Sequence, residues 1–163
     1  MPIAASISEG ISRPHLAIEG GSKLSGELKV SGAKNSALVL MTASLLCEDF
    51  ITLKNVPALV DIRNMEKILL TMGVTINREG NEINIKANSL KDTALPYDLV
   101  HGLRASFFCI GALLAKFGEV KIPLPGGCDI GLRPIDEHIN GLKALGAEII
   151  IEEGIVKAKL KGE

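Results

Sequence analysis

The feature that most constrains the fold is an internal repeat, because the same order of helix-like and strand-like segments occurs twice, about 70 residues apart. Each copy has a nearly all-apolar helix, an alternating strand, an amphipathic helix that ends at a glycine, and a hairpin with a Glu-Gly turn. The predicted segments are 34–46, 50–54, 61–72 and 74–87 in the first copy and 104–116, 119–123, 134–145 and 147–160 in the second. A further strand-like segment spans 26–31. The sequence therefore predicts an α/β chain of two β-α-β-α-β-β units.

The two kinds of helix differ in their apolar pattern. Segments 34–46 and 104–116 are apolar on nearly every side, which is typical of a helix inside a core. Segments 61–72 and 134–145 carry apolar residues on one face only and charges on the other. We therefore expect the first pair of helices to be more buried than the second.

The predicted boundaries follow from these patterns. Residues 1–14 are expected to be a disordered lead-in, and residues 15–163 a partial domain with unit one at about 26–88 and unit two at about 96–161. Hydrophobic residues make up 47% of the chain and aromatic residues only 3%, so the core must be aliphatic.

Charge and composition exclude several classes of protein. The net charge is −1 with both signs interspersed, which argues against binding to nucleic acid or to a membrane surface. The N-terminus does not resemble a signal peptide, and no apolar run reaches the ~20 residues of a membrane span. Three cysteines without framework spacing make a disulfide scaffold unexpected, so we expect a reducing, cytoplasmic location.

Cys128 lies in the segment PLPGGCDIGLRPIDE (residues 123–137), which predicts a glycine-rich loop between a strand and a helix. Arg133 could lower the pKa of the Cys128 thiol and make it reactive, although a free surface cysteine in a turn fits the pattern as well. Cys47 and Cys109 fall in the apolar helices and are interpreted as small hydrophobic residues.

A second candidate site lies at the start of each apolar helix. Lys34 and Asn35 open the first one, and Arg104 opens the second at the equivalent position. A cation at a helix N-terminus favours phosphate or carboxylate, whereas each of these charges taken alone is more often simply solvated. No P-loop or Rossmann glycine pattern and no metal-ligand cluster is present, so neither a nucleotide cofactor nor a metal is predicted. His138 is expected on a helix surface without a function.

These segments together resemble a known family. SGAKNSAL (31–38), LRASFF (103–108) and PLPGGCDIGLRPID (123–136) are similar to hallmark segments of the UDP-N-acetylglucosamine 1-carboxyvinyltransferases, and the match runs from about residue 15 to the end of the chain. The resemblance implies the inside-out α/β barrel of the enolpyruvyl transferases, with three units per domain, helices inside and sheets outside. It also implies transfer of the enolpyruvyl group of phosphoenolpyruvate to the 3′-hydroxyl of UDP-N-acetylglucosamine, the first committed step of peptidoglycan synthesis, without a cofactor.

The resemblance also assigns roles to residues. Cys128 would be the proton donor, would form a covalent phospholactoyl adduct and would be alkylated by fosfomycin. The phosphoenolpyruvate site would include Lys34 and Asn35, with Arg133 contacting this substrate too. The UDP-sugar would be bound by Arg104, Arg133, Pro134, Ile135, Asp136 and Glu137.

Length is the departure from the family, whose members are more than twice as long. The third unit, the aspartate base and further arginines would lie outside this chain, so we expect the chain alone to be inactive. We also expect an exposed apolar face that pairs with the remainder of the enzyme or causes self-association. Two alternatives remain: the sibling enolpyruvyl transferase of the shikimate pathway, and an inactive fragment that only binds a ligand or a partner.

Overall fold

A computed structural model describes residues 18–21, 23–90, 95–126 and 134–161 of the chain. The chain divides into two compact units, residues 1–30 and residues 31–163, and each is described by itself. Within the described residues, no helix is both long enough and apolar enough to cross a membrane.

The described part of the first unit contains no helix and no strand. The strand predicted at 26–31 is therefore wrong. Leu24, Leu28 and Val30 are 83%, 89% and 78% exposed. Alternation of apolar and polar residues favours an extended backbone, but a strand also needs a neighbouring strand to pair with its N–H and C=O groups. No described strand pairs with this segment.

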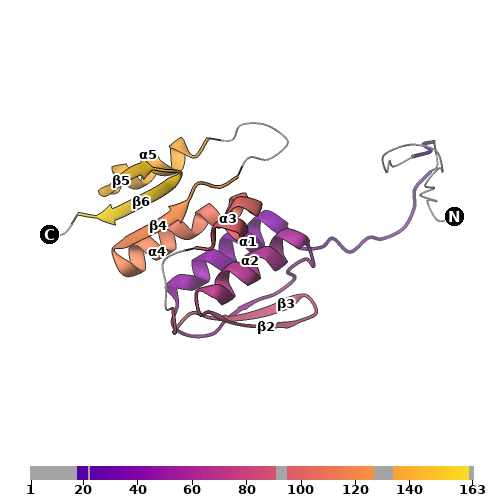
Figure 1. Ribbon diagram of the computed structural model, residues 1–163. Helices are drawn as coiled ribbons and strands as arrows, with labels where there is room; N and C mark the ends of the chain where they lie inside the picture. Colours follow the sequence, from indigo (N-terminus) through magenta and orange to yellow (C-terminus); the bar gives the residue numbers. More distant parts are fainter. Residues whose placement is uncertain (1–17, 22, 91–94, 127–133, 162–163) are drawn as a thin grey trace. The chain divides into compact units, whose positions relative to one another are not determined.

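The second unit begins with the first copy of the repeat (Figure 1). Its elements are α1 (Lys34–Ala43), the 3₁₀ turn η1 (Ser44–Leu46), β1 (Ile51–Leu53), α2 (Val60–Thr71), β2 (Thr75–Glu79) and β3 (Glu82–Lys86). The three strands form an antiparallel sheet in the order β1-β3-β2.

The second copy follows the same plan. Its elements are α3 (Tyr97–Gly102), the 3₁₀ turn η2 (Arg104–Phe108), α4 (Cys109–Phe117), β4 (Glu119–Pro123), α5 (Asp136–Ala144), β5 (Ala147–Glu152) and β6 (Ile155–Leu160). Its sheet has the equivalent order β4-β6-β5, which confirms the repeat predicted from the sequence. The short helix α3 was not predicted.

The predicted hairpin turns are also present. In the second copy Glu153 and Gly154 both have positive φ, at 50° and 75°. Two consecutive residues with positive φ are the signature of a type I′ turn, whose twist matches that of antiparallel strands.

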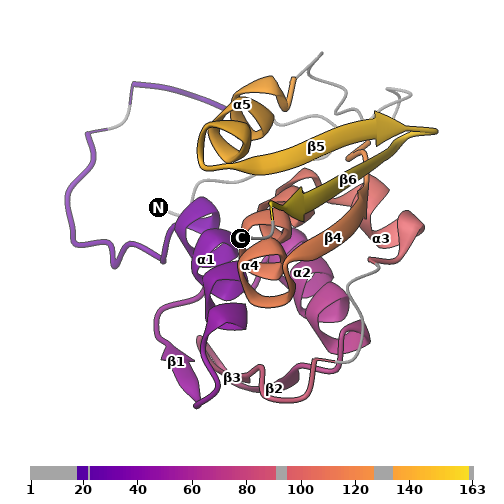
Figure 2. The ribbon, with the colours of Figure 1, turned by 90° about the vertical axis from the view of Figure 1, so that its left-hand side faces the viewer.

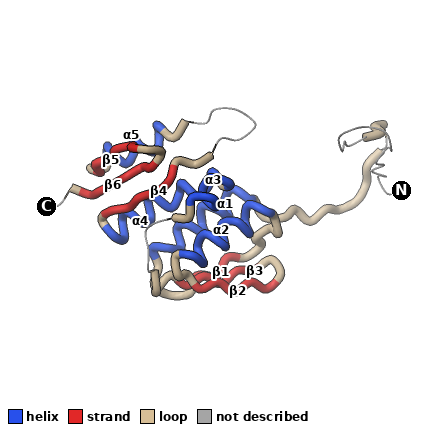
Figure 3. The backbone as a smooth tube through the Cα atoms, in the orientation of Figure 1, coloured by secondary structure: helices blue, strands red, loops and turns tan. Residues whose placement is uncertain are grey.

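The helices α1, α2 and α4 lie between the two sheets, as the ribbon and the tube show (Figures 1, 2 and 3). The core is aliphatic, and its largest fully buried side chains come from helices and sheets of both copies. These include Met41, Leu45, Ile62, Met65, Ile68, Leu69, Ile83, Ile85, Leu113 and Ile122. The predicted fold class, with helices inside and sheets outside, is thereby confirmed.

The expected difference in helix burial is clear in only one copy. In the second copy α4 buries five residues and α5 buries only Ile139. In the first copy the difference is small, because six residues are buried in the predicted range 34–46 and five in the range 61–72. The helix α2 is covered by α1, α3 and η2, whereas α1 leaves Val39 and Leu40 about half exposed.

One lysine joins the two copies through hydrogen bonds. Lys116, in the last turn of α4, donates from Nζ to the carbonyl oxygen of Leu45 at 3.0 Å and to that of Ala87 at 3.3 Å. Both acceptors belong to the first copy, so this ammonium group ties the end of one apolar helix to the end of the other.

Candidate functional site

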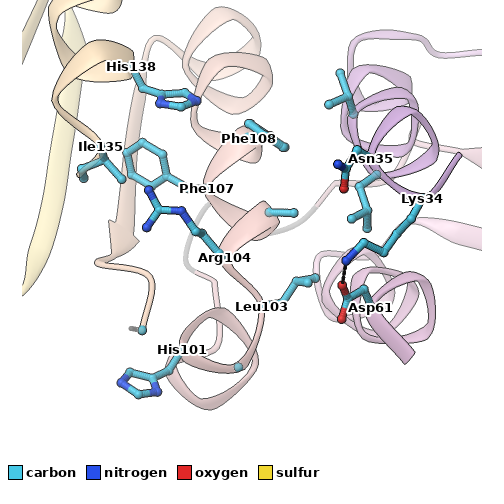
Figure 4. Close-up of a pocket in the computed structure, with 15 residues that line it drawn as sticks. Lys34, Asn35, Asp61, His101, Leu103, Arg104, Phe107, Phe108, Ile135 and His138 are labelled. Carbon is cyan, nitrogen blue, oxygen red and sulfur yellow. Dashed lines mark hydrogen bonds and ion pairs between the residues drawn. The ribbon is translucent and has the colours of Figure 1, made fainter. Parts of the chain in front are cut away.

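A pocket of about 460 Å³ lies where the two copies of the repeat meet. It is lined by the N-terminus of α1, the first turn of α2, the segment from α3 through η2, and the start of α5 (Figure 4). Both polar and apolar side chains reach it, so the pocket suits a ligand that has charged and ring-like parts.

Lys34 and Asp61 form the charged pair of this pocket. The Lys34 Nζ lies 2.5 Å from the Asp61 Oδ2, and the two side chains are 42% and 37% exposed (Figure 4). Lys34 is the first residue of α1, and Asp61 lies in the first turn of α2. Because α1 has neither a capping side chain nor an acidic residue in its first turn, the positive end of its dipole is not neutralised locally.

The start of α1 is held in place by a close backbone contact. A Cβ atom on Gly32 would overlap the carbonyl oxygen of Asn55 and would lie only 2.9 Å from its carbonyl carbon. Glycine at this position therefore lets the chain before Lys34 pass directly over the turn after β1.

Arg104 brings the second cation to the pocket. It begins η2, and its Nη2 donates to the carbonyl oxygen of Pro134 at 3.0 Å. This hydrogen bond ties the guanidinium to the residues that precede α5, where Ile135 also lines the pocket. Among the residues that the structure describes, no other hydrogen bond of the Arg104 guanidinium is found, so its other N–H groups can bind an anionic ligand.

An aromatic cluster borders the pocket. The His138 ring lies 5.8 Å from the Phe107 ring, edge-on, and 5.7 Å from the Phe108 ring. The interpretation of His138 as a surface residue without a role was incomplete: the side chain is exposed, but it borders the pocket beside these two rings. Spacing within the sequence did not reveal this, because η2 and α5 meet only in the tertiary structure.

His101 marks the opposite edge of the pocket. Its ring stacks on Tyr97 with a centroid distance of 5.7 Å. A Cβ on Gly126 would touch the carbonyl oxygen of His101 and would lie 2.7 Å from its Nδ1. The described end of the glycine-rich segment therefore rests directly on the last turn of α3.

The structure brings together four of the predicted site residues. Lys34, Asn35, Arg104 and Ile135 line the same pocket. Pro134 takes part through its carbonyl oxygen.

The other predicted residues are not part of that lining. Asp136 and Glu137 are exposed in the first turn of α5. Cys128 and Arg133 lie outside the described residues, so their predicted roles stay predictions.

The two remaining cysteines differ from each other. Cys109 is fully buried in α4, and burial raises the pKa of its thiol to about 12. This agrees with its interpretation as a small hydrophobic residue. Cys47 is half-buried after η1 and not inside a helix, because the apolar helix ends in a 3₁₀ turn at Leu46. No group of three potential metal ligands is found among the residues that the structure describes.

Comparison with known proteins identifies the family. The family model described as EPSP synthase (3-phosphoshikimate 1-carboxyvinyltransferase) matches residues 18–163. The chain belongs to this family of enolpyruvyl transferases.

Curated relatives within the family share another name. A UDP-N-acetylglucosamine 1-carboxyvinyltransferase of Prochlorococcus marinus strain MIT 9313 is 57% identical over 99% of this chain and 37% of its own length. The protein of the same name from strain MIT 9301 is 61% identical over 91% of this chain and 33% of its own length. That of Parasynechococcus marenigrum is 56% identical over 99% of this chain. The chain thus spans about a third of the length of the curated relatives it matches.

Solved structures agree on the fold. The enolpyruvyl transferase NikO from Streptomyces tendae superposes with a TM-score of 0.73 at 21% identity, over 87% of this chain and 31% of that protein. An EPSP synthase from Acinetobacter baumannii gives a TM-score of 0.58 at 22% identity, over 90% of this chain and 36% of that protein. The family assignment and the inside-out α/β fold therefore agree.

Proposed function

We propose that this chain is the part of a UDP-N-acetylglucosamine 1-carboxyvinyltransferase that binds phosphoenolpyruvate and the UDP-sugar. The observation that carries the proposal is the identity of 55–61% to proteins of that name over 90–99% of the chain. In the reaction, the 3′-hydroxyl of UDP-N-acetylglucosamine loses its proton and its oxygen forms a bond to C2 of phosphoenolpyruvate, while the methylene carbon C3 takes up a proton. In the second step C3 loses a proton, the C2–O bond to phosphate breaks, and inorganic phosphate leaves. Peptidoglycan synthesis in the cytoplasm is the process that such a product would serve.

The pocket supplies what the first substrate needs. Phosphoenolpyruvate carries a phosphate and a carboxylate. The pocket offers three positive groups to them, namely Lys34, Arg104 and the N-terminus of α1. Asn35 adds an amide at the same helix start. The proposed role of Arg133 is to complete this set of cations.

The UDP-sugar is assigned to the other side of the pocket. The Arg104–Pro134 hydrogen bond and Ile135 form a wall there, next to His138 and the phenylalanine rings. In this proposal Asp136 and Glu137 contact the sugar nucleotide from the first turn of α5. Cys128 would act as the acid that protonates the methylene carbon and would be the target of fosfomycin.

Calorimetric titration of the purified chain tests the binding half of the proposal. We expect heat from phosphoenolpyruvate and from UDP-N-acetylglucosamine. In Lys34→Met the phosphoenolpyruvate affinity should fall by about tenfold or more, since a charge-assisted contact contributes ~1.5–3 kcal/mol. Lys67→Met is the matched control, because Lys67 is exposed on α2 and does not line the pocket.

The alternatives give different results in the same experiment. Heat from shikimate 3-phosphate but not from the UDP-sugar would replace the proposal by the sibling activity. Heat from UDP-N-acetylglucosamine but not from phosphoenolpyruvate would mean that this chain is a fragment that binds only the sugar nucleotide. Failure of both substrates to bind would contradict the proposed function of the chain.

A further inference from the structure

We propose that Asp61 pairs with Lys34 until an anionic ligand displaces it, and so competes with anions and selects among them at this pocket. The inference rests on the proposed function, because it takes the pocket to bind phosphoenolpyruvate. Asp61 did not stand out in the sequence, where it is 27 residues from Lys34.

The geometry of the pair carries the first step. The Asp61 Oδ2 lies 2.5 Å from the Lys34 Nζ, so it occupies the position that a phosphate or carboxylate oxygen would take on that ammonium group (Figure 4). Both residues line the pocket, and they come from different helices. The carboxylate therefore holds the lysine side chain at the pocket in the absence of a ligand.

The exposure of the pair carries the second step. With 42% and 37% of the side chains exposed, the ion pair is in contact with solvent. Exposed ion pairs of this kind change an equilibrium constant by about fivefold at most. A ligand with two or three negative charges can therefore displace Asp61, whereas a singly charged anion gains little by doing so.

The position of Asp61 on its own helix carries the third step. It lies in the first turn of α2, where the helix dipole favours a negative charge. A carboxylate displaced from Lys34 thus keeps a favourable partner in the N–H groups of α2. By contrast, α1 has no acidic residue in its own first turn, so an incoming anion meets no second negative group on that helix.

The substitution Asp61→Asn separates this role from a merely structural one. Asparagine keeps the size of the side chain but removes the charge, so the lysine is freed and the pocket becomes more positive. We expect the dissociation constant for phosphoenolpyruvate to fall about three- to fivefold in calorimetry on the 163-residue chain. A residue that only supported the lysine would give the opposite sign, because its loss would weaken binding.

Three further variants complete the experiment. Asp98→Asn is the matched control, since Asp98 also lies in the first turn of a helix, is exposed and does not line the pocket; we expect no change. Asp61→Glu should bind phosphoenolpyruvate with nearly the affinity of the parent chain, because it keeps the carboxylate. In a Lys34→Met background the gain from Asp61→Asn should shrink to about twofold or less, because no lysine remains to be freed.

The outcomes distinguish this inference from the proposed function. Phosphoenolpyruvate binding that depends on Lys34 but is unchanged or weakened by Asp61→Asn would overturn the inference and leave the proposed function standing. Binding that does not depend on Lys34 would overturn the assignment of the site as well. No binding to any variant, including Asp61→Asn, would overturn both.

Discussion

Substituting Gly32 by alanine tests how the fold places the candidate site. Gly32 lies two residues before Lys34, and a Cβ there would overlap the carbonyl oxygen of Asn55 and approach its carbonyl carbon to 2.9 Å. Unstrained carbon–carbon contacts are ~3.5–4.0 Å. The added methyl group can therefore be accommodated only if one of two backbone segments moves by about 1 Å or more.

The size of the effect follows from which atoms must move. Overpacking typically costs about 1–3 kcal/mol, and the upper end applies here because the neighbour is backbone rather than the end of a flexible side chain. For a domain of this size each kcal/mol lowers the melting temperature by ~2–4 °C. We expect Gly32→Ala to melt about 6–12 °C lower than the parent chain and to bind phosphoenolpyruvate more weakly, since the start of α1 is displaced.

Thermal unfolding followed by circular dichroism measures this effect, and a second glycine provides the control. Gly141 lies inside α5, and a Cβ there meets no atom within 4 Å. Because alanine is the better helix former, Gly141→Ala should raise stability by about 0.5–1 kcal/mol. The reasoning is refuted if Gly32→Ala melts within about 1 °C of the parent chain while retaining its ligand affinity.

Three further predictions follow from burial and charge. Lys116→Met should lower the free energy of unfolding, measured in urea, by about 1–3 kcal/mol, because it removes both hydrogen bonds to Leu45 and Ala87. A variant as stable as the parent chain would show that these hydrogen bonds are dispensable. Burial raises the pKa of the Cys109 thiol from about 9 in the unfolded chain to about 12, so the free energy of unfolding should fall as the pH rises from ~9 to 12. Cys109→Ala should flatten this part of the stability profile, and equal slopes in the parent chain and the variant would contradict the prediction. The apolar side of α1, where Leu40 is 52% exposed, should cause self-association, so size-exclusion chromatography should give an apparent mass above 17.3 kDa that Leu40→Lys lowers; a monomeric parent chain would contradict this.

The sequence by itself determined the repeat and most of its elements. Periods of 3.6 and 2 residues are local properties of the chain, so the positions of α2, β4 and β5 could be predicted to within about two residues. The hairpin turns were equally predictable, because Gly80 and Gly154 adopt positive φ for reasons that are local. The cations Lys34 and Arg104 could be proposed as one site because the repeat places them at equivalent helix starts.

Only the tertiary structure decided which of these elements have neighbours. The segment 26–31 has a strand-like pattern but no described strand beside it, and backbone pairing is a property of two segments rather than one. For the same reason the burial of α1 could not be read from its composition, since Val39 and Leu40 are exposed despite being apolar. The ion pair of Lys34 with Asp61 is likewise a product of how two helices pack, and a side chain 27 residues away carries no local signal of that contact.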